Sequence, residues 1–97
     1  MIIQKTTPTL TFTAEGIDLT SYECFVYIKQ MDTLITKETT ATLEGEDSIV
    51  EVTLTPTESL SLKQGDAEAQ LYAMDGTDAV ASVSFPIVIG KILNPEL

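Results

Sequence analysis

The sequence contains no histidine, no arginine and no tryptophan, and it has a single cysteine, Cys24. A lone cysteine cannot form an internal disulfide, and no histidine is present to activate it as a nucleophile. Cys24 also lies within an apolar run, residues 24–28. We therefore expect it to be a small buried hydrophobic side chain and not a reactive thiol.

Positive charge is scarce as well. The 97 residues contain five lysines against fifteen acidic residues, so the net charge is −10. The lysines are isolated from one another, whereas binding to nucleic acid or to an anionic membrane requires clustered cations. We therefore expect neither partner. The acidity is expected to keep a β-rich protein soluble and to discourage pairing between sheet edges.

Long apolar runs are missing too. No segment approaches the roughly 18 apolar residues of a membrane span. The first residues, Met1 to Thr6, lack the basic start and the apolar run of about 7 to 15 residues that a signal peptide needs. The length predicts one domain, residues 1–97, that buries only roughly 60 to 65 per cent of its unfolded surface, so association with a partner chain is expected to add buried area.

What the sequence does contain is a period of two, in which apolar residues alternate with threonine or serine between acidic or glycine-containing turns. This alternation is typical of half-buried strands. It predicts an all-β sandwich of about seven strands, at residues 9–14, 23–31, 34–37, 39–43, 49–55, 67–74 and 79–89. In the last of these, Pro86 predicts an edge position or a bulge because it lacks an N–H donor.

One short helical turn interrupts this pattern at residues 55–60. Thr55 is expected to cap it, Pro56 suits its first position, and Glu58 completes a capping box. Leu60 and Leu62 would then attach this turn to the end of the sandwich.

The second predicted strand carries two aromatic residues on the face opposite the expected core. Cys24, Val26 and Ile28 share one face, and Phe25 and Tyr27 share the other. Two interpretations stay open: either a partner covers these aromatic side chains, or they form cross-strand pairs with threonine neighbours on an outer surface.

The acidic residues show no pattern of a metal or catalytic site. The turns at residues 44–47 and 75–78 lack the alternating ligands and distal glutamate of a calcium loop, and Asp and Gly there suit tight turns. Two carboxylates could in principle perform acid and base chemistry, but no pair is flanked by residues that would form an apolar pocket. We therefore expect no enzyme activity, no metal and no cofactor.

Several segments together resemble a known family. They are residues 8–13 (PTLTFT), 26–30 (VYIKQ), 52–60 (VTLTPTESL), 69–76 (AQLYAMDG) and the apolar ending at 88–93. The chain is similar to small prophage-encoded proteins of Gram-positive bacteria and to the amino-terminal domain of phage baseplate upper proteins. The resemblance implies an immunoglobulin-like antiparallel β-sandwich, a tail- or baseplate-associated structural protein, other phage proteins as partners, and a location in the bacterial cytoplasm during assembly and then in the virion.

Two functions follow as hypotheses. The first is a structural or assembly module that binds phage proteins or further copies of itself through Phe25, Tyr27, Ile92 and Leu93. The alternative is a carbohydrate- or cell-surface-binding sandwich that uses the tyrosines Tyr22, Tyr27 and Tyr72 as aromatic platforms.

Overall fold

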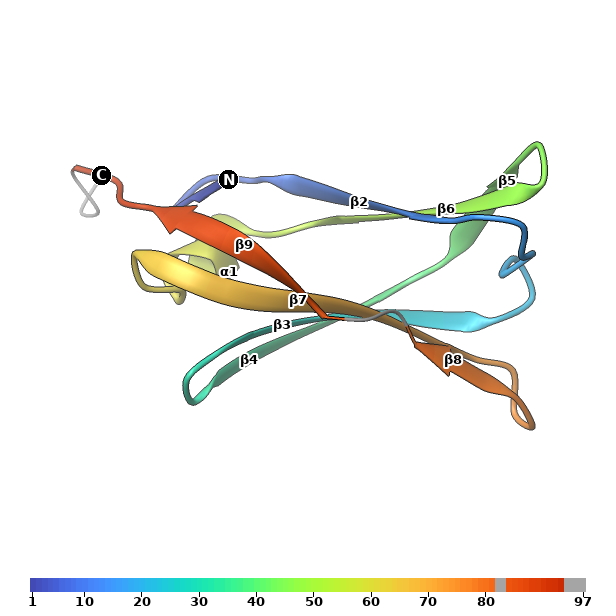
Figure 1. The fold of residues 1–97 in the computed structure, drawn as a ribbon. Helices are drawn as coiled ribbons and strands as arrows, with labels where there is room; N and C mark the ends of the chain where they lie inside the picture. Colours follow the sequence, from blue (N-terminus) through green and yellow to red (C-terminus); the bar gives the residue numbers. More distant parts are fainter. Residues whose placement is uncertain (82–83, 94–97) are drawn as a thin grey trace.

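The computed structural model of the protein describes residues 1–81 and 84–93, which form nine strands and one short helix in two layers (Figure 1). The all-β sandwich expected from the sequence is confirmed. The strands are β1 (Ile2–Ile3), β2 (Thr9–Ala14), β3 (Glu23–Gln30), β4 (Thr33–Thr39), β5 (Ala41–Glu44), β6 (Asp47–Thr53), β7 (Gly65–Met74), β8 (Ala79–Ala81) and β9 (Phe85–Gly90), and the helix is α1 (Pro56–Leu60).

The two layers are a six-stranded and a three-stranded sheet, here called the large and the small sheet. The large sheet has the order β1-β9-β7-β3-β4, with β8 also pairing with β7, and the small sheet has the order β2-β6-β5. The order β9-β7-β3-β4 matches strands G-F-C-C′ of the immunoglobulin fold, and β2-β6-β5 matches strands B-E-D. The pairs are antiparallel except for β1 with β9, which is parallel. The strand β1 was not predicted from the sequence because a strand of two residues shows no alternation.

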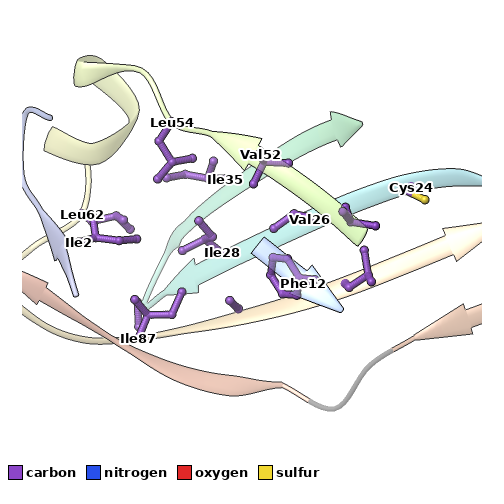
Figure 2. Packing of buried hydrophobic residues seen from close by; sticks show 14 of the residues in the cluster. Ile2, Phe12, Cys24, Val26, Ile28, Ile35, Val52, Leu54, Leu62 and Ile87 are labelled. Carbon is purple, nitrogen blue, oxygen red and sulfur yellow. The ribbon is translucent and has the colours of Figure 1, made fainter. Parts of the chain in front are cut away.

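The core lies between the sheets and follows the period of two (Figure 2). Cys24, Val26 and Ile28 of β3 are fully buried, as predicted for that face. Burying a side chain of this size stabilises a fold by about 1.5 to 3 kcal/mol. The inward residues of the central strand β7 are mostly alanine, which leaves room for larger side chains from β3 and β6.

Three buried polar side chains fasten the connections to the sandwich. Ser48 Oγ donates to the Ile17 carbonyl at 2.7 Å and accepts from the Leu19 N–H at 2.8 Å, which holds the link between β2 and β3. Ser59 Oγ donates to the Thr6 carbonyl at 2.7 Å and accepts from its N–H at 3.0 Å. The Gln30 amide donates to the Lys63 carbonyl and accepts from the Lys63 N–H, which holds the link between α1 and β7. Each side chain therefore satisfies backbone groups that a loop would otherwise leave unpaired.

The helix begins with the predicted capping box. The Thr55 hydroxyl accepts from the Glu58 N–H at 3.1 Å, and the Glu58 carboxylate accepts from the Thr55 N–H at 2.8 Å. Leu62 is fully buried, as expected, but the prediction for Leu60 is wrong because that side chain is 37% exposed. Within so short a helix, the face that meets the core carries Ser59 instead.

Glu58 gives the fold a pH-dependent contact. The Thr55 N–H and the Lys37 ammonium, 2.9 Å away, hold the pKa of Glu58 below its ordinary value of 4.5. The ionised form therefore stabilises the fold above pH 4.5, and this contribution is lost as the pH falls through the lowered pKa.

We expect Glu58→Gln, which can keep the capping geometry, to reduce stability at pH 7, with a difference from the parent protein that shrinks on acidification. Urea unfolding from pH 7 to pH 2 measures it, with the exposed Glu46→Gln as control. A difference that is the same at every pH would contradict the assignment.

The last predicted strand, residues 79–89, is wrong as a single element because the structure has β8 and β9 in its place. The odd-numbered residues of the two strands also lie on opposite faces of the sheet. Ala81 lies opposite Tyr72 on the outer face, whereas Ile87 and Ile89 point into the core. The prediction for Val83 falls outside the described residues. Pro86 pairs with Glu68 of β7, and β1 reaches only Ile89 and Gly90 on the other side of β9. Pro86 thus sits at a locally open edge, as its missing N–H predicts.

Candidate interaction surface

Among the outward residues of β3, β4 and β7, four apolar or aromatic side chains lie close together on the large sheet. Register places Phe25 opposite Tyr72, and Tyr27 opposite both Gln70 and Thr36. Leu34 follows on β4 beside Lys29. We call the set Phe25, Tyr27, Leu34 and Tyr72 the aromatic face. It exists because β3 carries aromatic residues at its odd-numbered positions while its even-numbered positions are used by the core.

Within the aromatic face, Tyr27 and Tyr72 lie diagonally across the strand pair. Their ring centroids are 6.2 Å apart and the ring planes are tilted by 40°. This distance falls in the range favourable for aromatic pairs. Both side chains and that of Phe25 are half-buried, whereas Leu34 is 60% exposed. Cross-strand pairing therefore accounts for part of the aromatic surface, and the remainder faces outward.

A shallow depression adjoins Tyr27. It has a volume of about 280 Å³ and is lined by Tyr27, Lys29, Leu34, Glu68, Ala69, Gln70 and Ser84. Lys29 and Glu68 are cross-strand neighbours, so opposite charges lie at one end of the depression. An amide, an ammonium and a carboxylate thus border an apolar floor. Such a surface can bind a molecule.

The structure places the four predicted interaction residues in two separate regions. Ile92 is half-buried and its N–H donates to Gln4 Oε1 at 3.3 Å, while Gln4 Nε2 donates to the Leu62 carbonyl. These two hydrogen bonds place Ile92, and with it the adjacent Leu93, at the α1 end of the sandwich. Leu93 is 94% exposed there. Gln30 marks this end of β3, and Phe25 lies about 17 Å further along the strand. Phe25 and Tyr27 belong to the aromatic face, and Ile92 and Leu93 do not adjoin them.

Two members of the aromatic face were missed as interaction residues. Tyr72 was noted only for carbohydrate binding, and Leu34 was assigned to a strand without a role. The signal that could have found them is the pairing of β3 with both β4 and β7, which a single sequence leaves open. Tyr22 does not join the face: it packs against the core, and partial desolvation together with Asp75 and Asp78 raises its pKa.

The other side chains that could carry chemistry, the Cys24 thiol and the carboxylates, have structural roles. Cys24 is buried, as expected, and desolvation raises the pKa of its thiol, which disfavours the thiolate. Asp75 Oδ1 accepts from the Asp78 N–H at 2.8 Å and so closes the turn before β8. Among residues 1–81 and 84–93, no three side chains of His, Cys, Asp or Glu come together as a metal site. Nor does this part of the chain contain a helix long and apolar enough to cross a membrane.

In comparisons with known proteins, no family model and no curated protein matches this chain.

Proposed function

We propose that this protein is a non-enzymatic protein-binding module of a phage or prophage particle, associated with the tail or baseplate. The observation that carries the binding role is the aromatic face, in which three aromatic rings of β3 and β7 and Leu34 of the edge strand β4 lie on the large sheet's outer surface. The phage context comes from the resemblance of the sequence segments to baseplate upper proteins.

The composition of the aromatic face suits a protein partner. Aromatic residues are enriched at the centres of interfaces, where they contribute large contact area at low cost in side-chain entropy. The charged residues Glu23, Lys29 and Glu38 lie on the same outer face and form a polar border. An apolar centre with a polar rim is the usual arrangement of an interface that forms between separately folded proteins.

Tyr27→Glu is expected to reduce incorporation of the protein into particles at least tenfold, because an interface would have to bury an unpaired carboxylate. Mass spectrometry of particles purified from an induced host that carries the coding sequence measures this. Leu43→Glu, the same change at an exposed apolar residue of the small sheet, is the control. Light scattering after size-exclusion chromatography shows whether the partner is a second copy. Equal incorporation of both variants, or no protein in the particles at all, would refute the proposal.

A carbohydrate-binding module is the second candidate, favoured by one observation. The tilted Tyr27 and Tyr72 rings have the Gln70 amide beside them, and sugar sites combine aromatic platforms with amides and carboxylates. Glycan-array binding that disappears in Tyr72→Ala would favour this candidate over the assembly role.

A further inference from the structure

Within the described residues, the strand β2 pairs along one edge only, with β6. Its register with β6 continues to Pro8, whose carbonyl accepts from the Leu54 N–H at 3.0 Å. In an antiparallel pair, the residues whose backbone groups face the partner alternate along the strand. The even-numbered residues of β2 therefore bond to β6, and the N–H and C=O groups of Thr9, Thr11 and Thr13 point to the other side. In the order of the small sheet, β2 is an edge strand of the described chain.

An apolar groove runs beside this edge, between the two sheets. One part has a volume of about 430 Å³ and includes Phe12, Leu71, Ala73 and Val80 in its lining. A second part continues past Thr11 and Phe12 toward Ile87 and Val88 of β9. Both parts share residues of β2, so the groove follows most of the strand. A strand added beside β2 would therefore have an apolar groove on its inner side, whereas the threonine side chains of β2 face outward.

The immunoglobulin fold has a strand at this position. In the constant-type sandwich, strand A pairs with the outer edge of strand B, which corresponds to β2 here. In this protein the first strand, β1, pairs with β9 of the large sheet instead. The small sheet consequently presents both the hydrogen-bonding edge and the apolar groove that a further strand requires.

We propose that β2 binds an extended segment of another protein, which adds to the small sheet as a fourth strand. The apolar side chains of the added segment, at alternate positions, lie in the groove, and the backbone of the segment pairs with Thr9, Thr11 and Thr13. Charge favours a neutral or basic segment: Glu15 lines the groove, Glu51 lies opposite Thr11, and the chain carries −10.

A second folded copy is a poorer occupant. On its edge strands β2 and β4 the inward side chains Phe12 and Ile35 are buried already, at 7% and 8% exposed. Such strands could offer backbone groups but would leave the groove unfilled. Two copies would also bring together chains of charge −10 each. A flexible segment from a different chain avoids both costs.

The test uses the synthetic peptide acetyl-Lys-Val-Thr-Val-Thr-Val-Lys-amide and isotope-labelled protein. Titration is expected to shift the amide resonances of β2. In antiparallel addition the threonine N–H groups of the peptide face β2 and the valine N–H groups face solvent. N-methylation of both threonines should weaken binding at least tenfold, and N-methylation of two valines should change it less than twofold. The reverse dependence would indicate parallel addition and also support a bound strand.

Two protein variants separate this surface from the aromatic face. Thr11→Pro removes an N–H that points to the free edge and leaves the β2–β6 ladder in place, so it should weaken peptide binding at least tenfold without a large loss of thermal stability. Tyr27→Glu should bind the peptide as the parent protein does. The inference is overturned if millimolar peptide leaves the β2 amides unshifted, if the two methylation patterns weaken binding equally, or if the β2 edge of the free protein proves to be paired with a second copy.

Discussion

Ile28→Ala is expected to lower the free energy of unfolding by about 3 to 4 kcal/mol, within the range measured for buried isoleucine or leucine truncations. Ile28 is fully buried on β3, which pairs on both sides, and it lies in the middle of the core cluster in Figure 2. Its cross-strand neighbours are Ile35 and Ala69. Because Ala69 is small and both neighbours belong to rigid strands, they cannot fill the space that the lost atoms leave.

For a domain of this size the change should lower the melting temperature by about 12 to 25 °C. Thermal unfolding and urea unfolding both measure it. Ile28→Val should cost only about 0.5 to 1.5 kcal/mol because it removes one methylene. Leu43→Ala, at a half-exposed position of β5, should stay within about 0.5 kcal/mol of the parent. A loss below about 1 kcal/mol for Ile28→Ala would mean that β3 does not pack as described.

The elements that the sequence predicts well are those in which a local pattern has a single interpretation. The alternation of residues 23–31 specifies which face of β3 is buried, and Cys24, Val26 and Ile28 are indeed in the core. Thr55, Pro56 and Glu58 predict the start of α1 because each contact of a capping box lies within three residues. Such short-range physics can be inferred without knowing what the rest of the chain does.

The predictions fail where the local pattern has two interpretations. Residues 79–85 place small or apolar side chains at both odd and even positions, so their alternation does not specify which face is buried. The structure shows Ala79 and Ala81 exposed and on the outer side, whereas Ile87 and Ile89 are buried. Polar residues in the core are missed for a related reason. Nothing in the local sequence of Ser48 or Ser59 shows that distant loop carbonyls will need a donor.

Two of the four residues of the aromatic face were predicted from the sequence as interaction residues. Phe25 and Tyr27 were singled out because aromatic residues on the face opposite the core are unusual for a surface in contact with water. That Tyr72 joins them, and that Leu93 does not adjoin them, depends on which strands pair and where β9 ends. The unpaired edge of β2 could not be foreseen either, because the same sequence would read as a strand whether or not a neighbour lay beside it.

The second large effect is expected for Gln30→Met, which keeps the length of the side chain and removes its hydrogen bonds. Gln30 is buried at the end of β3. Its Nε2 donates to the carbonyls of Lys63 and Asp66 at 2.7 and 3.2 Å, and its Oε1 accepts from the Lys63 N–H at 2.6 Å. One side chain thus satisfies two backbone groups of Lys63, in the link between α1 and β7, and one of Asp66 at the start of β7. Leaving such groups unpaired costs about 1 to 3 kcal/mol each when they are fully buried, and we expect a total loss of about 2 to 4 kcal/mol because the link is partly open to water.

Denaturant unfolding measures the loss, and Gln64→Met in the same link is the matched control because Gln64 is exposed. Amide hydrogen exchange separates this effect from a general loss of stability: the Lys63 N–H should exchange faster in Gln30→Met under conditions where the β3 amides are still protected. If Gln30→Met is as stable as Gln64→Met, the link does not depend on Gln30. Gln30 would then only be tolerated in the core, and the link between α1 and β7 would be held by Leu62 and its apolar neighbours.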